Sequence, residues 1–181
     1  LERAETLLGQ LSDTHRDKQG LTARLRWAQG QREDAWVLAE QELFNQAHTI
    51  QSTLLSMLDW ALKEGDRERA RVFSDTAVRS GEVFDLSDYA VLSTPFQLAA
   101  AEEDGPRALA LLDRLLESLT VPWDLSVSPL YSHLSTKDAT EESQRGLIPL
   151  LLDSMERDPE CAFLRTEPGY QELLQKYREN T

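Results

Sequence analysis

Proline is absent from the first 94 residues of this sequence, because all seven prolines lie at or after Pro95. Proline breaks helices more strongly than any other residue, so this region can form long uninterrupted helices. No segment alternates with a period of two for long enough to predict a half-buried strand. Apolar residues instead recur at helical spacing, as in the stripe of Leu54, Leu55, Leu58, Ala61 and Leu62. The sequence therefore predicts an all-α protein.

Residues that start or end helices divide the chain further. Ser87 before Asp88 predicts an N-cap, and Asp138 with Glu141 predicts a capping box. The segment 121–139 is predicted to be an irregular connection before the last helical unit, and a connection of this length is either functional or an elaborated loop. The predicted helices span residues 2–12, 20–29, 31–46, 48–64, 66–80, 87–103, 106–120, 140–157 and 168–179.

A glycine followed five residues later by an alanine occurs three times. The pairs are Gly30 with Ala35, Gly65 with Ala70, and Gly105 with Ala110. The glycines are 35 and 40 residues apart, close to the period of about 34 residues of a two-helix solenoid unit. Glycine adopts the left-handed conformation at a helix end without a Cβ penalty, and a small alanine lets the next helix pack closely. Because one such hairpin cannot bury its apolar face alone, stacked hairpins are predicted.

This pattern resembles the tetratricopeptide repeat, whose two-helix unit has a turn glycine, an alanine five residues later and another small residue seven beyond that. Gly65, Ala70 and Ala77 match all three positions, whereas Glu42 and Glu117 occupy the third position of the other copies. The resemblance covers the chain from about Gly20 to Leu119, with a degenerate fourth unit after Thr140. It implies an α-solenoid of three to four hairpins with extra terminal helices. An irregular helical bundle is the alternative.

Two later segments resemble the C-terminal parts of multi-domain bacterial regulators. They are VPWDLSVSPLYSHL at 121–134 and LIPLLLDSMERDPECAFLRTEPGYQELLQKY at 147–177. In such regulators a helix-turn-helix DNA-binding headpiece precedes a tetratricopeptide-like sensor region. The chain begins with Leu1 rather than methionine, so residues 1–181 are expected to be a single helical-repeat domain from a longer protein.

The resemblance to the repeat also implies where a partner would bind. The first helix of each unit lines a concave groove, and the glycine register places Arg24, Ser52, Leu55, Asp59, Leu92, Phe96 and Ala99 there. The family's clamp for a C-terminal carboxylate uses lysines, an arginine and asparagines. Asp59 and Ala99 stand where that clamp requires asparagine, which disfavours a carboxylate-clamp role. A mixed apolar groove would better suit a helix or a short peptide.

Four tryptophans have two different interpretations. Trp27, Trp36 and Trp60 lie within predicted hairpins and are interpreted as core residues, with stacking against a ligand as the alternative. Trp123 lies in the irregular connection. It either packs against the end of the solenoid or forms part of a binding surface.

The charge of the chain excludes several classes of partner. The net charge is −13, with 19 acids against 8 bases in residues 82–181. Such a surface repels phosphate backbones, so no direct nucleic-acid contact is expected. The acidity either keeps the domain soluble or forms a face for a basic partner. No apolar run approaches the roughly 20 residues that span a bilayer, so no membrane contact is expected. The single cysteine, Cys161, fits a reducing compartment, and the expected location is cytoplasmic.

Residues that could carry out catalysis do not form a recognisable motif. His15, His48 and His133 are far apart and have no metal-ligand spacing with Cys161. Ser132 precedes His133, but adjacent side chains diverge and rarely supply nucleophile and base together. No enzyme activity, metal or cofactor is expected. The predicted function is that of a non-catalytic protein- or peptide-binding, sensor or dimerisation domain of a bacterial regulator, with homodimers expected. The alternative is a scaffold without ligand-linked switching.

Overall fold

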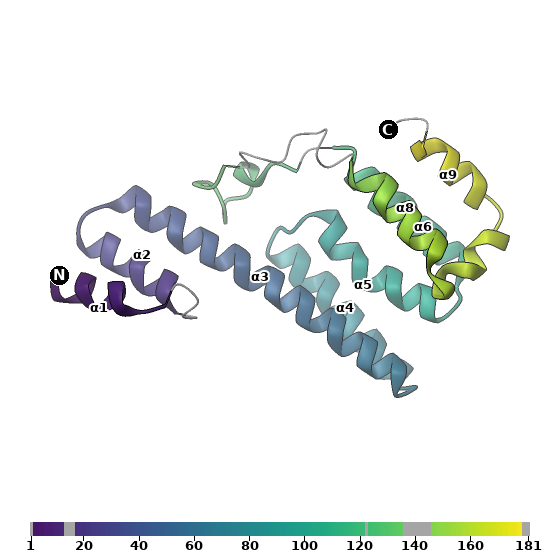
Figure 1. Ribbon diagram of the computed structural model, residues 1–181, viewed down its shortest axis with the longest axis horizontal. Helices are drawn as coiled ribbons and strands as arrows, with labels where there is room; N and C mark the ends of the chain where they lie inside the picture. The colour runs from purple at the N-terminus through teal and green to yellow at the C-terminus, as the bar shows by residue number, and fades with distance from the viewer. Residues whose placement is uncertain (1, 13–16, 122, 136–145, 179–181) are drawn as a thin grey trace. The chain divides into compact units, whose positions relative to one another are not determined.

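The computed structural model describes residues 2–12, 17–121, 123–135 and 146–178. All regular structure within them is helical, which confirms the predicted all-α class (Figure 1). The α-helices are α1 (Glu2–Gln10), α2 (Lys18–Ala28), α3 (Arg32–Lys63), α4 (Arg67–Val83), α5 (Asp88–Ala101), α6 (Gly105–Ser118), α8 (Leu147–Arg157) and α9 (Tyr170–Arg178), and the 3₁₀ helices are η1 (Leu125–Val127) and η2 (Pro159–Thr166). None of the described helices is both long and apolar enough to cross a membrane.

The chain separates into two compact units. Unit 1 comprises Leu1–Ala47 and Asp124–Thr136, and unit 2 comprises His48–Trp123 and Lys137–Thr181. The single repeat domain predicted over residues 1–181 stays a prediction. The predicted capping box of Asp138 and Glu141 lies outside the described residues. The predicted N-cap at Ser87 is confirmed, since its hydroxyl accepts a hydrogen bond from the Ala90 amide.

One predicted helix boundary is wrong. A break was expected between residues 46 and 48, but α3 continues without interruption from Arg32 to Lys63. The residues at the expected break are Gln46, Ala47 and His48, and none of them is a glycine or proline. No residue type there forces the chain out of the helical conformation, so the helix propagates through the position.

The turns after α2, α3, α4 and α5 have the same backbone geometry. In each turn a residue with positive φ follows the helix, and the amide of the next residue donates to a carbonyl five residues earlier, as in a Schellman motif. The positive-φ residues are Gly30, Gly65, Asp85 and Glu103, at 82°, 77°, 47° and 54°. The hydrogen bonds run from Gln31 to Arg26, from Asp66 to Ala61, from Leu86 to Gly81 and from Asp104 to Ala99, at 3.0, 2.9, 2.9 and 3.0 Å.

The third of the predicted glycine turns, which follows α5, lies two residues earlier than the glycine register predicted. The alanine five residues after Glu103 is Ala108, which is fully buried, whereas Ala110 is exposed. Gly105 is already the first residue of α6, and a Cβ added there would overlap the side chain of Glu167. Gly105 is therefore small because of close packing, and its backbone does not need the left-handed conformation. In the first two copies the predicted alanines, Ala35 and Ala70, are buried as expected.

Unit 2 has a core formed by α6, α8, η2 and α9. Its most deeply buried side chains include Leu112, Leu116, Ile148, Leu152 and Leu164. A second cluster joins the C-terminal part of α3 to α4 and α5 through Leu58, Ala61, Ala70 and Leu98. Of the predicted apolar stripe, Leu58 and Ala61 are buried in the second cluster and Leu62 packs against it, whereas Leu54 and Leu55 are only partly buried.

Cys161 is buried in the core of unit 2. Burial raises the pKa of its thiol to about 11, and the nearby carboxylates of Asp158 and Glu160 add to this effect. The reactive thiolate is therefore scarce near neutral pH.

At pH 8, Cys161 is expected to react with iodoacetamide at least about tenfold more slowly in the folded chain than in urea, because unfolding removes the burial that raises the thiol pKa. Mass spectrometry of timed aliquots measures both rates. The rate of the folded chain should rise as the pH approaches 11. Equal rates in the folded and unfolded chain would contradict the burial of this thiol.

Candidate functional site

An apolar pocket lies in unit 1 between α2 and the N-terminal part of α3. Its volume is about 360 Å³. Trp27 and Trp36 form two of its walls, and each side chain is 47% exposed. The complete lining consists of Ala23, Arg24 and Trp27 from α2 and Ala35, Trp36 and Ala39 from α3. Arg24 is the only charged residue among these six.

The local sequence explains why a hollow forms here. The Gly30 turn reverses the chain, so that α2 and α3 pack side by side, and the Gln19 side chain donates to the Leu38 carbonyl at 3.2 Å. The lining positions between the two tryptophans are alanines, whose short side chains leave space between the large indole rings. The pocket is therefore a consequence of small residues facing each other across a tight helical hairpin.

The two tryptophan rings are held in a defined arrangement. Their centroids are 6.0 Å apart and their planes meet at 88°, which is the favoured edge-to-face geometry. The guanidinium carbon of Arg32 lies 3.8 Å from the centroid of the Trp27 ring, and Arg32 also donates to the Trp27 carbonyl at 2.7 Å. This cation–π contact fixes Trp27 from the side of α3.

Trp36 is fixed by a residue that is distant in the sequence. Its ring stacks on His133, with centroids 5.6 Å apart and planes within 5°. The His133 amide donates to Glu40 Oε2 at 2.8 Å, and His133 Nδ1 lies 2.6 Å from Glu40 Oε1. The side chain of Glu40 is buried on α3. We call these contacts the Glu40–His133 clasp, and it holds one tryptophan of the pocket in place.

The segment that carries His133 is itself packed within unit 1. Tyr131 is fully buried, and its ring meets Phe44 of α3 edge to face at 5.5 Å. The Asp124 side chain accepts a hydrogen bond from the Ser126 amide at 2.9 Å and so starts η1. The described part of the predicted irregular connection thus contributes directly to the candidate site.

Ser132, His133 and Glu40 lie together, but their geometry does not suit a catalytic triad. A triad needs the serine and the acid at opposite nitrogens of the imidazole ring. Here Ser132 Oγ lies 3.3 Å and Glu40 Oε1 lies 2.6 Å from the same atom, Nδ1. The contacts at Nδ1 therefore position the histidine ring, and they do not place serine and acid as a triad requires.

The interpretation of Trp27, Trp36 and Trp60 as core residues is wrong, because their side chains are 47%, 47% and 62% exposed. Indole rings are hydrophobic enough to suggest burial, but the neighbouring helices cover only part of each. The alanines at 23, 35 and 39 were the signal that could have indicated a hollow beside two of them. Sequence reasoning also missed Glu40, whose partner His133 is 93 residues away.

The predicted groove residues and Trp123 fall in different places. Arg24 lines the pocket of unit 1, and the others belong to unit 2. Asp59 pairs with Lys63 at 2.7 Å and lines a separate hollow of about 450 Å³. Ser52 is exposed, Leu92 is buried, and Leu55, Phe96 and Trp123 are partly buried. Their predicted role in one groove stays a prediction.

Unit 2 contains a polar cluster that links α6 to α9. The Asp113 carboxylate accepts hydrogen bonds from Lys176 Nζ and Tyr177 Oη, each at 2.7 Å. Burial would raise the pKa of Asp113, but the hydrogen bonds from Lys176 and Tyr177 outweigh it and lower the pKa. Burial raises the pKa of Tyr177 to about 12. All three groups keep their ordinary charge at neutral pH, so the cluster holds two helices together and offers no acid or base.

Metal-ligating residues do not gather in the described part of the chain, where no group of three or more His, Cys, Asp or Glu side chains could hold an ion. His48 lies on α3 and His133 in the clasp, while His15 lies outside the described residues. Comparison with known proteins gave no matching family model, no matching curated protein and no matching solved structure.

Proposed function

We propose that this chain is a non-catalytic protein- or peptide-interaction domain, and that the pocket between α2 and α3 receives an apolar side chain of its partner. The observation that carries the proposal is the pair of half-exposed tryptophans held by Arg32 and His133. Side chains that are already fixed lose little conformational entropy on binding, so more of the contact energy becomes affinity. Burying one apolar side chain there contributes about 1.5–3 kcal/mol.

Two helical hairpins of unit 2 support the further proposal of a tetratricopeptide-like array. The turns from α3 to α4 and from α5 to α6 share their hydrogen bonds, and the buried Ala70 and Ala108 follow at the same distance. In such an array the partner would also contact the predicted groove residues of unit 2. A crystal structure of the chain with its partner would test both surfaces.

The place of this domain in a larger protein is also a proposal. The resemblance of segments 121–134 and 147–177 to bacterial regulators supports a cytoplasmic sensor or dimerisation role. Sequencing the complete reading frame tests this part, and a DNA-binding headpiece upstream is the expected result. A regulator should change its shape or its dimerisation when ligand binds, as measured by X-ray scattering and light scattering. A scaffold should not.

Replacing Trp36 with alanine is expected to weaken peptide binding by about tenfold or more, because it removes one wall of the pocket. Short random peptides are first selected on the immobilised chain, and those with a common apolar residue are synthesised. Fluorescence anisotropy then compares the variant with the original chain.

The matched control is Trp60→Ala, since Trp60 is also on α3 but is 62% exposed and lies outside the pocket lining. This control should bind the same peptides with unchanged affinity. If Trp36→Ala binds as well as Trp60→Ala, the pocket is not the binding site.

A further inference from the structure

Arg24 is a cation at an otherwise uncharged pocket. It lies on α2 three residues before Trp27, which places both side chains on one helix face. Its side chain is exposed, and no described carboxylate lies within ion-pair distance of it. The neighbouring arginines differ: Arg26 hydrogen-bonds Gln31 at 2.9 Å, and Arg32 covers Trp27. Of these three arginines in the α2–α3 hairpin, only Arg24 has no described hydrogen-bond, ion-pair or cation–π partner.

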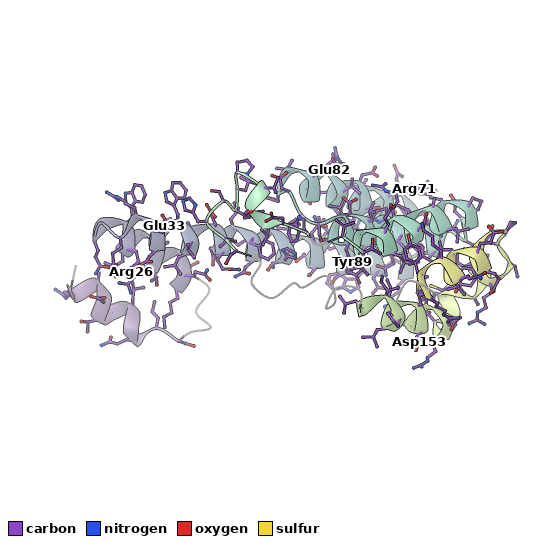
Figure 2. The ribbon with its side chains drawn as sticks, turned by 90° about the horizontal axis from the view of Figure 1, so that it is seen from above. Arg26, Glu33, Arg71, Glu82, Tyr89 and Asp153 are labelled. Atoms are coloured by element: carbon purple, nitrogen blue, oxygen red, sulfur yellow. The ribbon has the colours of Figure 1, made fainter. Side chains whose placement is uncertain are left out.

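Glu40, Glu33 and Asp34 of α3 form no described ion pair with Arg24. Glu40 is occupied by His133 in the clasp. Glu33 and Asp34 are in the first turn of α3 at positions that do not line the pocket. Arg26 and Glu33, labelled in Figure 2, lie on α2 and α3 and are both absent from the lining. The pocket therefore combines an apolar interior with one available guanidinium.

From this arrangement we infer that the partner is an acidic peptide segment, in which a carboxylate stands beside the apolar side chain that enters the pocket. The carboxylate binds the Arg24 guanidinium, whose planar fork can donate two parallel hydrogen bonds. The inference rests on the proposed function and adds the chemical class of the partner. Two perpendicular indoles could in principle hold a methylated ammonium group, but Arg24 and Arg32 repel a cation.

Charge reversal at Arg24 tests the class of peptide directly. Peptides selected on the original chain are expected to carry Asp or Glu next to the common apolar residue. Selection on Arg24→Glu is expected to replace that acid with Lys or Arg and to keep the apolar residue. The control variant is Arg67→Glu, an exposed arginine of α4 outside the pocket, which should select the same acidic peptides as the original chain. Unchanged acidic peptides from Arg24→Glu would overturn the inference.

Two fluorescent probes separate failure of the inference from failure of the proposed function. The anionic probe 1-anilinonaphthalene-8-sulfonate and the neutral N-phenyl-1-naphthylamine share their aromatic rings. Trp36→Ala is expected to weaken both, whereas Arg24→Gln should weaken the anionic probe about fivefold and leave the neutral one within about twofold. Added salt should weaken the anionic probe for the original chain but not for Arg24→Gln.

The remaining outcomes of the probe experiment are also decisive. If Trp36→Ala weakens both probes and Arg24→Gln weakens neither, the pocket binds apolar groups but does not select an anion, and the inference fails alone. If neither probe responds to Trp36→Ala, the proposed function of the pocket fails with it. If Arg24→Gln binds tetramethylammonium more tightly than the original chain binds the anionic probe, the inference of an acidic partner is wrong. The partner would then be a cation.

Discussion

Replacing Glu40 with alanine is expected to destabilise unit 1 by about 2–4 kcal/mol, because it removes a buried carboxylate that holds His133 through two close contacts. The amide of His133 would lose its acceptor, and the ring would lose the group that orients it against Trp36. Urea unfolding followed by tryptophan fluorescence measures the loss of stability. Hydrogen exchange of the His133 amide should accelerate in the same variant.

Glu42→Ala provides the control for this experiment. Glu42 is on the same helix and partly buried, but its side chain bonds only locally, accepting from Gln46 Nε2 at 2.6 Å. A local pair of this kind stabilises a helix by about 0.2–0.5 kcal/mol. Glu40→Ala should also weaken the neutral probe in the pocket, since Trp36 loses its stacked partner. If the two variants unfold at the same urea concentration, the clasp does not stabilise unit 1.

Replacing Gly81 with alanine is expected to destabilise unit 2 by about 1–3 kcal/mol. This is the reverse of the usual effect, because alanine favours a helix over glycine by about 1 kcal/mol. Gly81 is buried in α4, and an added Cβ would lie 2.6 Å from Val91 Cγ2 and 3.2 Å from Gln51 Nε2. Val91 is itself buried on α5, so its methyl group cannot move into solvent. Thermal unfolding by circular dichroism measures the change.

A double variant tests the cause of this destabilisation. Val91→Ala removes the methyl group that the new Cβ would meet, so Gly81→Ala should be neutral or stabilising in that background. Gly20→Ala is a second control, because Gly20 lies in α2 and nothing would contact its added Cβ. The close packing of α4 and α5 is contradicted if Gly81→Ala costs the same stability with valine or with alanine at position 91.

Much of the helical fold could be predicted because it depends on local chemistry. The absence of proline from the first 94 residues and the apolar periodicity predicted the all-α class, and Gly30 and Gly65 predicted the positions of two turns. The third turn was misplaced because Glu103 adopts a positive φ, which residue preferences assign to glycine. The length of α3 was missed for the opposite reason, since no residue in its middle either ends or demands a helix.

The candidate site was harder to predict because it depends on contacts across the chain. The glycine register predicted Arg24 as a groove residue, and Arg24 lines the pocket, but its role in binding stays a prediction. Hydrophobicity alone assigned Trp27 and Trp36 to the core, since a sequence does not say which faces of a helix its neighbours leave uncovered. The partners Glu40 and His133 have no local spacing that would link them.

The four Schellman turns in the described residues have a consequence for how such a chain can change in evolution. Their common property is a pair of backbone groups, and the residue in the left-handed position is glycine in two turns, aspartate in one and glutamate in one. Because the hydrogen bonds involve no side chain, substitutions and small insertions near a helix end can shift the turn by a residue or two while the hairpin persists. Two related hairpins could therefore lose all recognisable sequence similarity and still reverse the chain through the same backbone hydrogen bonds.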